Sequence, residues 1–343
     1  MRNNLIVALI AAVFLMFTLP ASSSAEVITL TLTDQNPETG WGTTHALKPW
    51  IKKVEEATKG KVKIQLYPSQ TLSKGKDAWN AVKNGIADMG WGFHGFWAGM
   101  TPLADVITLP GLPIKNAEKG SEVLWQLYEK YPEIREGFKD NHVLLLFSSA
   151  PYHLITTKKQ VKTLADLKGM KIRTTGGPPI DQMKALGAVP VSVPMPGNYM
   201  AMQKGVTDGM GAPWDAIYSF RLYEVAPYFT YAPLSCVYFS ISINKNKWNS
   251  LPKDIQEAIT SVSGLEAAKF FGANYHDSAK QGVFMKAKDS GFKIIEYTPP
   301  ADELKKWEDK GGKPVWGKWV KQMEAKGHPK AQEILNTTID LLK

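Results

Sequence analysis

The sequence has almost no cysteine, since Cys236 is the only one among 343 residues. A single cysteine excludes an intramolecular disulfide and a metal site built from several cysteines. The fold must therefore be held by core packing, for which 44% apolar residues are ample. Motifs of catalysis are also missing: there is no G-x-S-x-G, no H-E-x-x-H and no glycine-rich phosphate loop. The six histidines are scattered, so we expect neither a metal nor a cofactor.

Long hydrophobic runs are missing everywhere except at the N-terminus. A run from Leu5 to Leu19 follows a basic residue, ends at Pro20 and is succeeded by small residues. This is the pattern of a secretory signal peptide, and we expect residues 1–25 to be removed. The run is too short for a comfortable membrane span, and no cysteine follows it to carry a lipid anchor. We therefore expect an exported, soluble protein.

Charge of one sign is nowhere concentrated. The formal net charge of +9 is spread along the chain, and lysines cluster only on expected helix surfaces and turns. A nucleic-acid site would need basic residues on one face, so we expect no nucleic-acid partner. A weak long-range attraction for anions is all that this charge implies. The length allows two domains.

The stretch from Leu164 to Asp215 alternates short apolar strands with helical segments. The expected strands are Met170–Thr174, Val189–Val193 and Gly209–Ala212, and the helices are Pro179–Leu186 and Asn198–Lys204. This alternation predicts a parallel sheet, whose ligands bind at the carboxyl ends of the strands. Arg173 and the turn Ala212-Pro213-Trp214 both lie at such ends. A cation beside a large aromatic ring suits an organic anion with an apolar body.

Two earlier segments are expected at the same crevice. Residues 27–67 have the pattern of a βαβ unit: an alternating strand, a loop, a helix and a second strand. The loop after the first strand carries Gln35, Asn36 and Trp41. The segment W-G-F-H-G-F-W then places four aromatic residues next to two glycines. Glycine permits close backbone approach and the rings offer flat walls, so Trp91 and Phe93 are candidates for lining a pocket.

Several ordered motifs resemble the solute-binding proteins of tripartite ATP-independent periplasmic (TRAP) transporters. They are L-A-D-L-K-G-M-K-I-R with G-V-T-D-G, I-Q-L-Y-P-S-Q-T-L, A-V-K-N-G-I-A-D-M and W-N-S-L-P. The resemblance implies a two-lobed α/β periplasmic binding protein fold, in which each lobe is a mixed sheet flanked by helices. Hinge strands and a long helix over about 253–290 would join the lobes. We expect lobe I at 26–149 plus about 236–270, and lobe II at 150–235 plus about 271–343.

The resemblance also implies roles for individual residues. Arg173 matches the family's arginine that binds a ligand carboxylate, and His153 stands where many members carry a second basic residue. Met195 stands where the family often has an aromatic residue. Phe93 and Ala212 replace polar ligand contacts of members that bind hydroxylated acids. The expected ligand-binding residues are thus Arg173, Trp214, Phe93, His153, Trp41, Trp91, Gln35, Met195 and Ala212.

These residues indicate the ligand class. One firm cation and an apolar surrounding favour an aromatic (indole or aryl) or 2-oxo monocarboxylate, and a C4-dicarboxylate is the alternative. An exported enzyme acting on an organic acid is the alternative from another class of protein. A second alternative, the ligand-sensing domain of a signalling protein, would need a membrane tether. The resemblance implies a periplasmic monomer that delivers its ligand to a small and a large membrane subunit.

Overall fold

The first lobe contains a five-stranded mixed sheet with the order β2-β1-β3-β10-β4. Its strands are β1 (Ile28–Thr33), β2 (Val62–Tyr67), β3 (Met89–Phe93), β4 (Asn141–Ser148) and β10 (Tyr238–Asn244). In this computed structural model, which describes residues 27–343, β1 pairs in parallel with β2 and β3. β10 runs antiparallel between β3 and β4, because the chain returns to the first lobe late. The expected signal peptide lies outside the described residues.

The second lobe contains a six-stranded mixed sheet with the order β11-β9-β5-β8-β6-β7. Its strands are β5 (His153–Thr156), β6 (Lys171–Arg173), β7 (Val189–Val191), β8 (Gly209–Ala212), β9 (Tyr228–Thr230) and β11 (Ile295–Tyr297). β6 pairs in parallel with β7 and β8, so Arg173 and Ala212 lie at carboxyl ends of adjacent strands. His153 is paired in register with Ala212 on the antiparallel neighbour β5.

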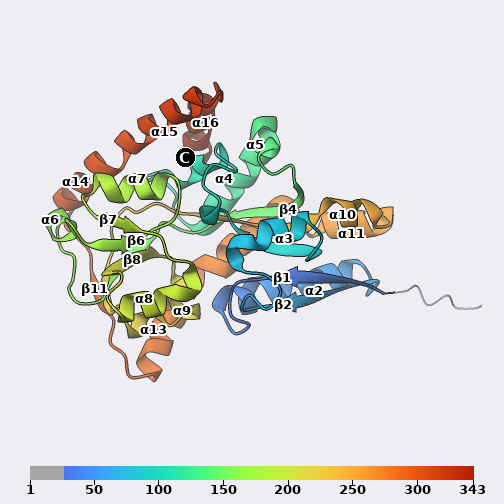
Figure 1. Ribbon diagram of the computed structural model, residues 1–343, viewed down its shortest axis with the longest axis horizontal. Helices are drawn as coiled ribbons and strands as arrows, with labels where there is room; N and C mark the ends of the chain where they lie inside the picture. Colours follow the sequence, from blue (N-terminus) through green and yellow to red (C-terminus); the bar gives the residue numbers. More distant parts are fainter. Residues whose placement is uncertain (1–26) are drawn as a thin grey trace, which may run out of the picture.

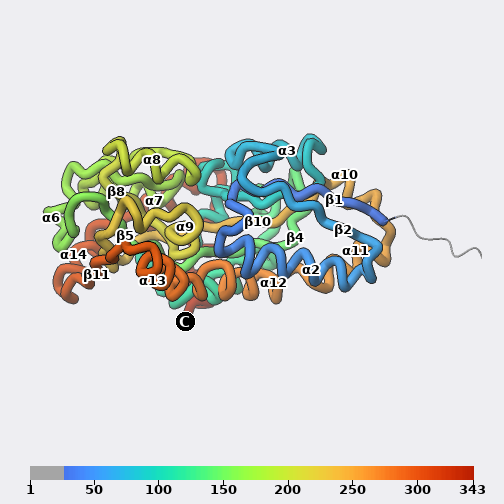
Figure 2. The backbone as a smooth tube through the Cα atoms, turned by 90° about the horizontal axis from the view of Figure 1, so that it is seen from below, coloured from blue at the N-terminus to red at the C-terminus, as the bar shows by residue number. Residues whose placement is uncertain are grey.

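Helices flank both sheets, and the lobes lie side by side along the long axis of the molecule (Figures 1 and 2). The first lobe carries α2 (Lys48–Ala57), α3 (Ala78–Lys83), α4 (Ala117–Lys130), α5 (Pro132–Glu136), α10 (Lys245–Ser250) and α11 (Lys253–Ser261). The second carries α6 (Leu164–Leu167), α7 (Pro178–Ala185), α8 (Asn198–Gln203) and α9 (Trp214–Ser219). The expected two-lobed α/β fold is confirmed. None of the helices within residues 27–343 has the length and apolar character to span a bilayer.

Two extended segments cross between the lobes next to each other. The Ser149 amide donates to the Val237 carbonyl at 2.8 Å, and the Tyr152 amide donates to the Ser235 carbonyl at 3.2 Å. The first crossing is a candidate for one of the hinge strands that the family resemblance implies. Because two paired strands bend more readily than a packed helix bundle, this ladder is suited to a hinge.

The long helix expected over about 253–290 is interrupted near its start. α11 ends at Ser261, and the chain restarts at Gly264, whose φ of 67° is left-handed and incompatible with a continuous helix. From there α12 (Gly264–Phe271), a π-helical segment (Gly272–Asp277) and α13 (Ala279–Asp289) follow one another. α12 packs on α4 and α13 packs on α9, so this helical path does join the lobes.

The C-terminal tail makes a further connection. α14 (Ala301–Gly311) and α15 (Lys313–Ala325) pack on α7, whereas α16 (Ala331–Leu342) packs on α4 of the first lobe. There the Tyr131 hydroxyl lies 3.0 Å from Glu333 Oε1 and 2.8 Å from Thr337 Oγ1. The tail therefore contacts both lobes (Figure 1), and the lobe boundaries given above stay a prediction.

The close approach of the interlobe helix to α4 can be tested at Gly272. A Cβ atom there would lie 2.5 Å from the Ala117 carbonyl oxygen and 2.6 Å from Glu118 Cα. Because these are backbone atoms, we expect Gly272→Ala to lower the free energy of unfolding by about 1–3 kcal/mol. Gly317, within α15, has nothing within 4 Å of a Cβ, so Gly317→Ala is the matched control.

Thermal unfolding followed by circular dichroism measures both variants. The control is expected to be neutral or to stabilise the protein by about 0.5–1 kcal/mol, because alanine favours the helix. Equal melting temperatures for Gly272→Ala and the wild type would show that the helix and α4 are not in contact.

Candidate functional site

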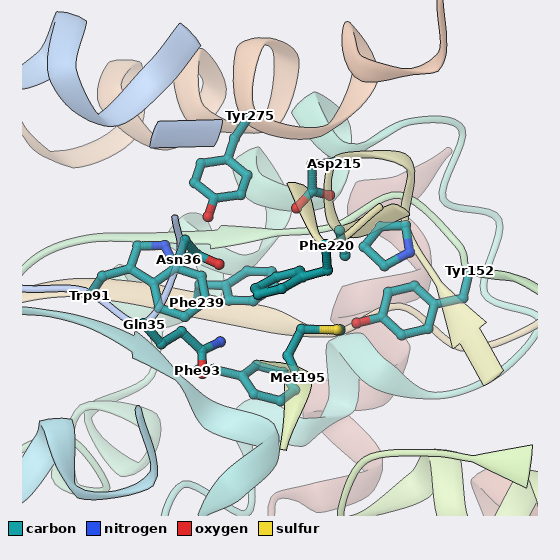
Figure 3. Close-up of a pocket in the computed structure, with 12 residues that line it drawn as sticks. Gln35, Asn36, Trp91, Phe93, Tyr152, Met195, Asp215, Phe220, Phe239 and Tyr275 are labelled. Carbon is teal, nitrogen blue, oxygen red and sulfur yellow. The ribbon is translucent and has the colours of Figure 1, made fainter. Parts of the chain in front are cut away.

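A cavity lies between the lobes, where the ends of the two sheets face each other. About 320 Å³ of space between atoms lies there, including space that is open to solvent. The lining residues come from both lobes and from both connections between them: Gln35, Asn36, Trp91, Phe93, Tyr152, Met195, Pro213, Asp215, Ala216, Phe220, Phe239 and Tyr275. Figure 3 shows Asp215 and Tyr275 pointing into the cavity from one side, with Gln35, Phe93 and Met195 on the opposite side.

Aromatic rings form the walls of this cavity. Trp91 and Phe93 come from β3, where both are 3% exposed. The ring of Phe239, on the neighbouring strand β10, lies 4.9 Å from that of Trp91 and 5.4 Å from that of Phe93. Tyr275 stacks beyond Trp91 with the ring centroids 6.2 Å apart. The first lobe thus offers a continuous flat apolar surface to a planar ligand.

Arg173 lies beside the cavity, at the carboxyl end of β6, and is only 1% exposed. Its Nε donates to the Val193 carbonyl at 3.0 Å, whereas Nη1 is buried without a hydrogen-bond partner. Burial lowers the pKa of this guanidinium, and only the nearby Tyr152 opposes that shift. Among residues 27–343 no carboxylate forms an ion pair with it, so this charge lacks a protein counterion.

Tyr152 links Arg173 to the cavity. It lines the cavity from the first interlobe crossing, and Figure 3 places its hydroxyl next to the sulfur of Met195. Burial raises the pKa of Tyr152, although the Arg173 charge opposes the shift. The hydroxyl therefore stays protonated at neutral pH and can donate a hydrogen bond. Arg173 and Tyr152 together present donors to an anion at this end.

Two aspartates lie near the cavity, and each has a feature that limits its repulsion of an anion. Burial raises the pKa of Asp34 to about 7, although hydrogen bonds from Asn36 oppose the shift. Asp215 Oδ1 lies 2.6 Å from His276 Nδ1 and accepts its hydrogen bond. The first carboxyl is therefore partly protonated near neutral pH, and the second has an imidazole donor beside it.

Four of the nine residues expected at the site line the cavity: Gln35, Trp91, Phe93 and Met195. Arg173 adjoins it through Tyr152, whereas His153, Trp214 and Ala212 lie behind the second lobe's lining and are absent from the cavity wall. The Trp214 ring stacks on Phe229 at 5.5 Å and packs against His153 at 4.8 Å. Burial and the nearby Lys280 lower the pKa of His153 to about 4, so its ring is neutral at pH 7.

Trp41 lies between the lobes rather than on the cavity wall. Its backbone amide donates to Ser219 Oγ at 2.9 Å, and its indole Nε1 donates to Ser278 Oγ at 2.9 Å. A Cβ on Gly282 of α13 would lie 2.2 Å from the Trp41 ring. A first-lobe side chain is thus packed closely against α9 and α13 of the second lobe.

Several lining residues were not singled out from the sequence as ligand contacts. Asn36 and Asp215 directly follow Gln35 and Trp214, so their positions in the same loops could have suggested them. Phe239, Tyr275 and the Asp215 partner His276 gave no local signal, because only the return of the chain across the lobes brings them here. Among residues 27–343, no cluster of three or more His, Cys, Asp and Glu side chains could hold a metal ion.

Comparisons with known proteins agree with this architecture. The family model described as "Bacterial extracellular solute-binding protein, family 7" matches residues 36–322. The outer membrane transporter protein TsaT of Comamonas testosteroni is 28% identical over 328 residues, which cover 93% of this chain and 92% of that protein.

Two solved structures are also similar across almost the whole chain. A TRAP solute-binding protein of Rhodoferax ferrireducens T118, solved with copurified benzoate, is 27% identical with a TM-score of 0.86. A marine metagenome TRAP solute-binding protein, specific for aromatic acid ligands and solved with 3-hydroxybenzoate, is 28% identical with a TM-score of 0.86. Each comparison covers 92% of this chain and 98% of the other.

The buried carboxyl of Asp34 predicts a pH dependence of stability. Its pKa is 3.8 when exposed and about 7 in the folded protein, so the folded state binds the extra proton. The stabilisation from this proton is complete below pH 3.8 and is lost as the pH rises through about 7. Asp34→Asn keeps an acceptor for Asn36 and removes the titration, so it should flatten this decline.

Urea unfolding between pH 4 and pH 8 compares the two proteins. Asp105, whose pKa burial also raises to about 7, contributes a decline of the same sign in both proteins. The prediction therefore concerns the difference: Asp34→Asn should gain stability relative to the wild type as the pH rises. Parallel profiles would contradict it.

Proposed function

This chain belongs to family 7 of the bacterial extracellular solute-binding proteins, the TRAP receptors of organic acids, and we propose that it binds an aromatic monocarboxylate. The observation that carries the proposal is the buried Arg173, which has no counterion within residues 27–343 and adjoins a cavity walled by aromatic rings. Both similar structures described above contain an aromatic acid, which supports the ligand class.

In this proposal the ligand carboxylate binds Arg173. Two parallel hydrogen bonds from a guanidinium fork fit a carboxylate, and each charge-assisted bond contributes about 1.5–3 kcal/mol. Tyr152 donates a further bond from beside the arginine. Arg173 lies near Tyr152, which lines the cavity, so the carboxylate binds at the end of the cavity that Tyr152 marks. Met195 also lines the cavity, and its flexible thioether can adapt to the shape of the ligand.

The ring of the ligand lies against the aromatic wall of the first lobe. Trp91, Phe93 and Phe239 are almost fully buried, so a planar apolar ligand replaces water at a surface that hydrates poorly. A C4-dicarboxylate fits this cavity less well, because the second carboxylate would need a second cation. His153, the candidate for that role, is neutral at pH 7 and packs against Trp214.

Four of the expected residues act on the ligand indirectly in this proposal: Trp41, Trp214, Ala212 and His153. Trp214 and His153 support the strand ends that carry the Ala212-Pro213 turn, and Pro213 lines the cavity. Trp41 bridges the lobes and thereby favours the closed form. Closure excludes water from the carboxylate–Arg173 pair and strengthens it.

The family works with membrane subunits, and we propose that the closed form of this chain docks on a small and a large one as a monomer. Export by the N-terminal signal peptide would place it in the periplasm. The receptor role implies that the bound acid is released unchanged. Mass spectrometry of small molecules released from protein purified without added ligand tests this, because an altered acid after incubation would indicate an enzyme.

Arg173→Lys tests the carboxylate site. Lysine keeps the charge and loses the bidentate fork, so the loss of one charge-assisted bond should weaken benzoate binding about 10- to 150-fold. The matched control is Arg221→Lys, because the Arg221 side chain is 61% exposed and pairs only with Glu224 within residues 27–343. Isothermal titration calorimetry measures both, and circular dichroism verifies folding. An unchanged benzoate affinity in Arg173→Lys would contradict the assignment of Arg173 as the carboxylate-binding residue.

The ligand class has its own test. Equilibrium dialysis with radiolabelled benzoate and with succinate compares an aryl acid with a C4-dicarboxylate. We expect benzoate to be retained and succinate to pass. Retention of succinate alone would favour the dicarboxylate reading.

A further inference from the structure

We propose that the Asp215–His276 pair recognises a hydrogen-bond donor on the ligand, so that the preferred ligand is a hydroxy- or amino-substituted aryl acid. This inference rests on the proposed function and narrows it. The pair provides a second polar group at the cavity besides Arg173.

Asp215 is positioned to accept a bond from a ligand. It lies at the start of α9, lines the cavity and is 7% exposed. Oδ1 accepts from His276 Nδ1 at 2.6 Å, and within residues 27–343 no protein hydrogen bond uses Oδ2. Figure 3 shows the carboxylate directed into the cavity from the same side as Tyr275. One oxygen is therefore held by the protein, and the other faces the ligand space.

His276 orients this carboxylate. It is 2% exposed, and its ring lies 5.2 Å from Phe239 and 5.8 Å from Phe147. Its second nitrogen, Nε2, is buried without a hydrogen-bond partner. Buried polar nitrogens usually have hydrogen-bond partners. In His276 only Nδ1 has one within residues 27–343, the Asp215 carboxylate. The bond fixes the carboxylate rotamer and offsets its charge near an anionic ligand.

Asp215 and Arg173 contact different parts of a ligand. Arg173 forms no hydrogen bond or ion pair with a carboxylate within residues 27–343, so Asp215 does not occupy its donors. Tyr152, which lines the cavity, is close enough to both charges for each to act on its pKa. A ligand that satisfies both groups has a carboxylate for Arg173, a ring for the aromatic wall and a hydroxyl or amine for Asp215. A carboxylate accepts from such a donor strongly.

The shape of the cavity does not fix the position of the donor on the ring. The probes are therefore benzoate and the 2-, 3- and 4-isomers of hydroxybenzoate and aminobenzoate. For the wild type, calorimetry should show at least one isomer binding about tenfold more tightly than benzoate, the effect of one added hydrogen bond.

Asp215→Asn separates recognition from structural support. The Asn amide oxygen can still accept from His276, so its NH₂ group faces the cavity and opposes an arylamine. The preference for the best aminobenzoate over benzoate should fall at least about tenfold. The ratio of the two affinities is the readout, because removing a negative charge from the cavity also changes the binding of benzoate itself. Asp309→Asn is the matched control, because the Asp309 side chain is 61% exposed on α14. It should leave all affinities unchanged.

The outcomes distinguish this inference from the function on which it rests. Loss of benzoate and substituted acids by the same factor would show that Asp215 only supports the structure, and would overturn the inference. Benzoate binding as tightly as every isomer would also overturn it while leaving the proposed function intact. Failure of all aryl acids to bind the wild type would overturn both.

A measurement on the wild type keeps the test valid if Asp215→Asn does not fold. In a crystal structure with the tightest-binding isomer, the ring donor should lie within hydrogen-bonding distance of Asp215 Oδ2. A donor group directed elsewhere would contradict the proposal.

Discussion

A guanidinium buried without a carboxylate beside it in the described part of the chain is the constraint on which the rest of this molecule depends. Removing a charge from water costs several kcal/mol even after relaxation, and the hydrogen bond from Arg173 to the Val193 carbonyl offsets only part of this. The acidic groups near the cavity do not pair with the guanidinium: burial raises the pKa of Asp34 to about 7, and Asp215 is bonded to His276. The missing negative charge is therefore one that a ligand can supply, and closing the lobes around it increases its effect.

The two lobes supply different parts of that binding site. The first lobe offers a flat aromatic surface on β3 and β10, which in the proposed function binds the ring of the ligand. The second lobe offers the polar groups at the ends of β6 and β8, which in the same proposal select among ring-bearing acids. Both connections between the lobes also reach the cavity, through Tyr152 and Tyr275. Ligand contact and hinge geometry are thus coupled, as closure of a receptor around its ligand requires.

Local sequence patterns predicted much of this arrangement, because the carboxyl ends of parallel strands meet at one edge of a sheet. That rule placed Arg173 beside the crevice and Gln35 in a loop that lines it. It could not place Trp41, whose ring packs between α9 and α13, nor Trp214, whose ring turns onto Phe229. Tyr275 and His276 lie on a helical path that carries no local sign of a ligand role. The sequence did not predict the helix break at Gly264, because the residues that follow it have ordinary helical composition.

The most direct measurement of the central claim compares benzoate with benzamide by calorimetry. The two molecules have nearly the same shape, but only benzoate carries the charge that Arg173 lacks in the protein. Leaving that charge unpaired is costly, so benzamide should bind at least about 100-fold more weakly than benzoate. Similar affinities for the two would show that the cavity binds the ring alone and that Arg173 has no part in recognition.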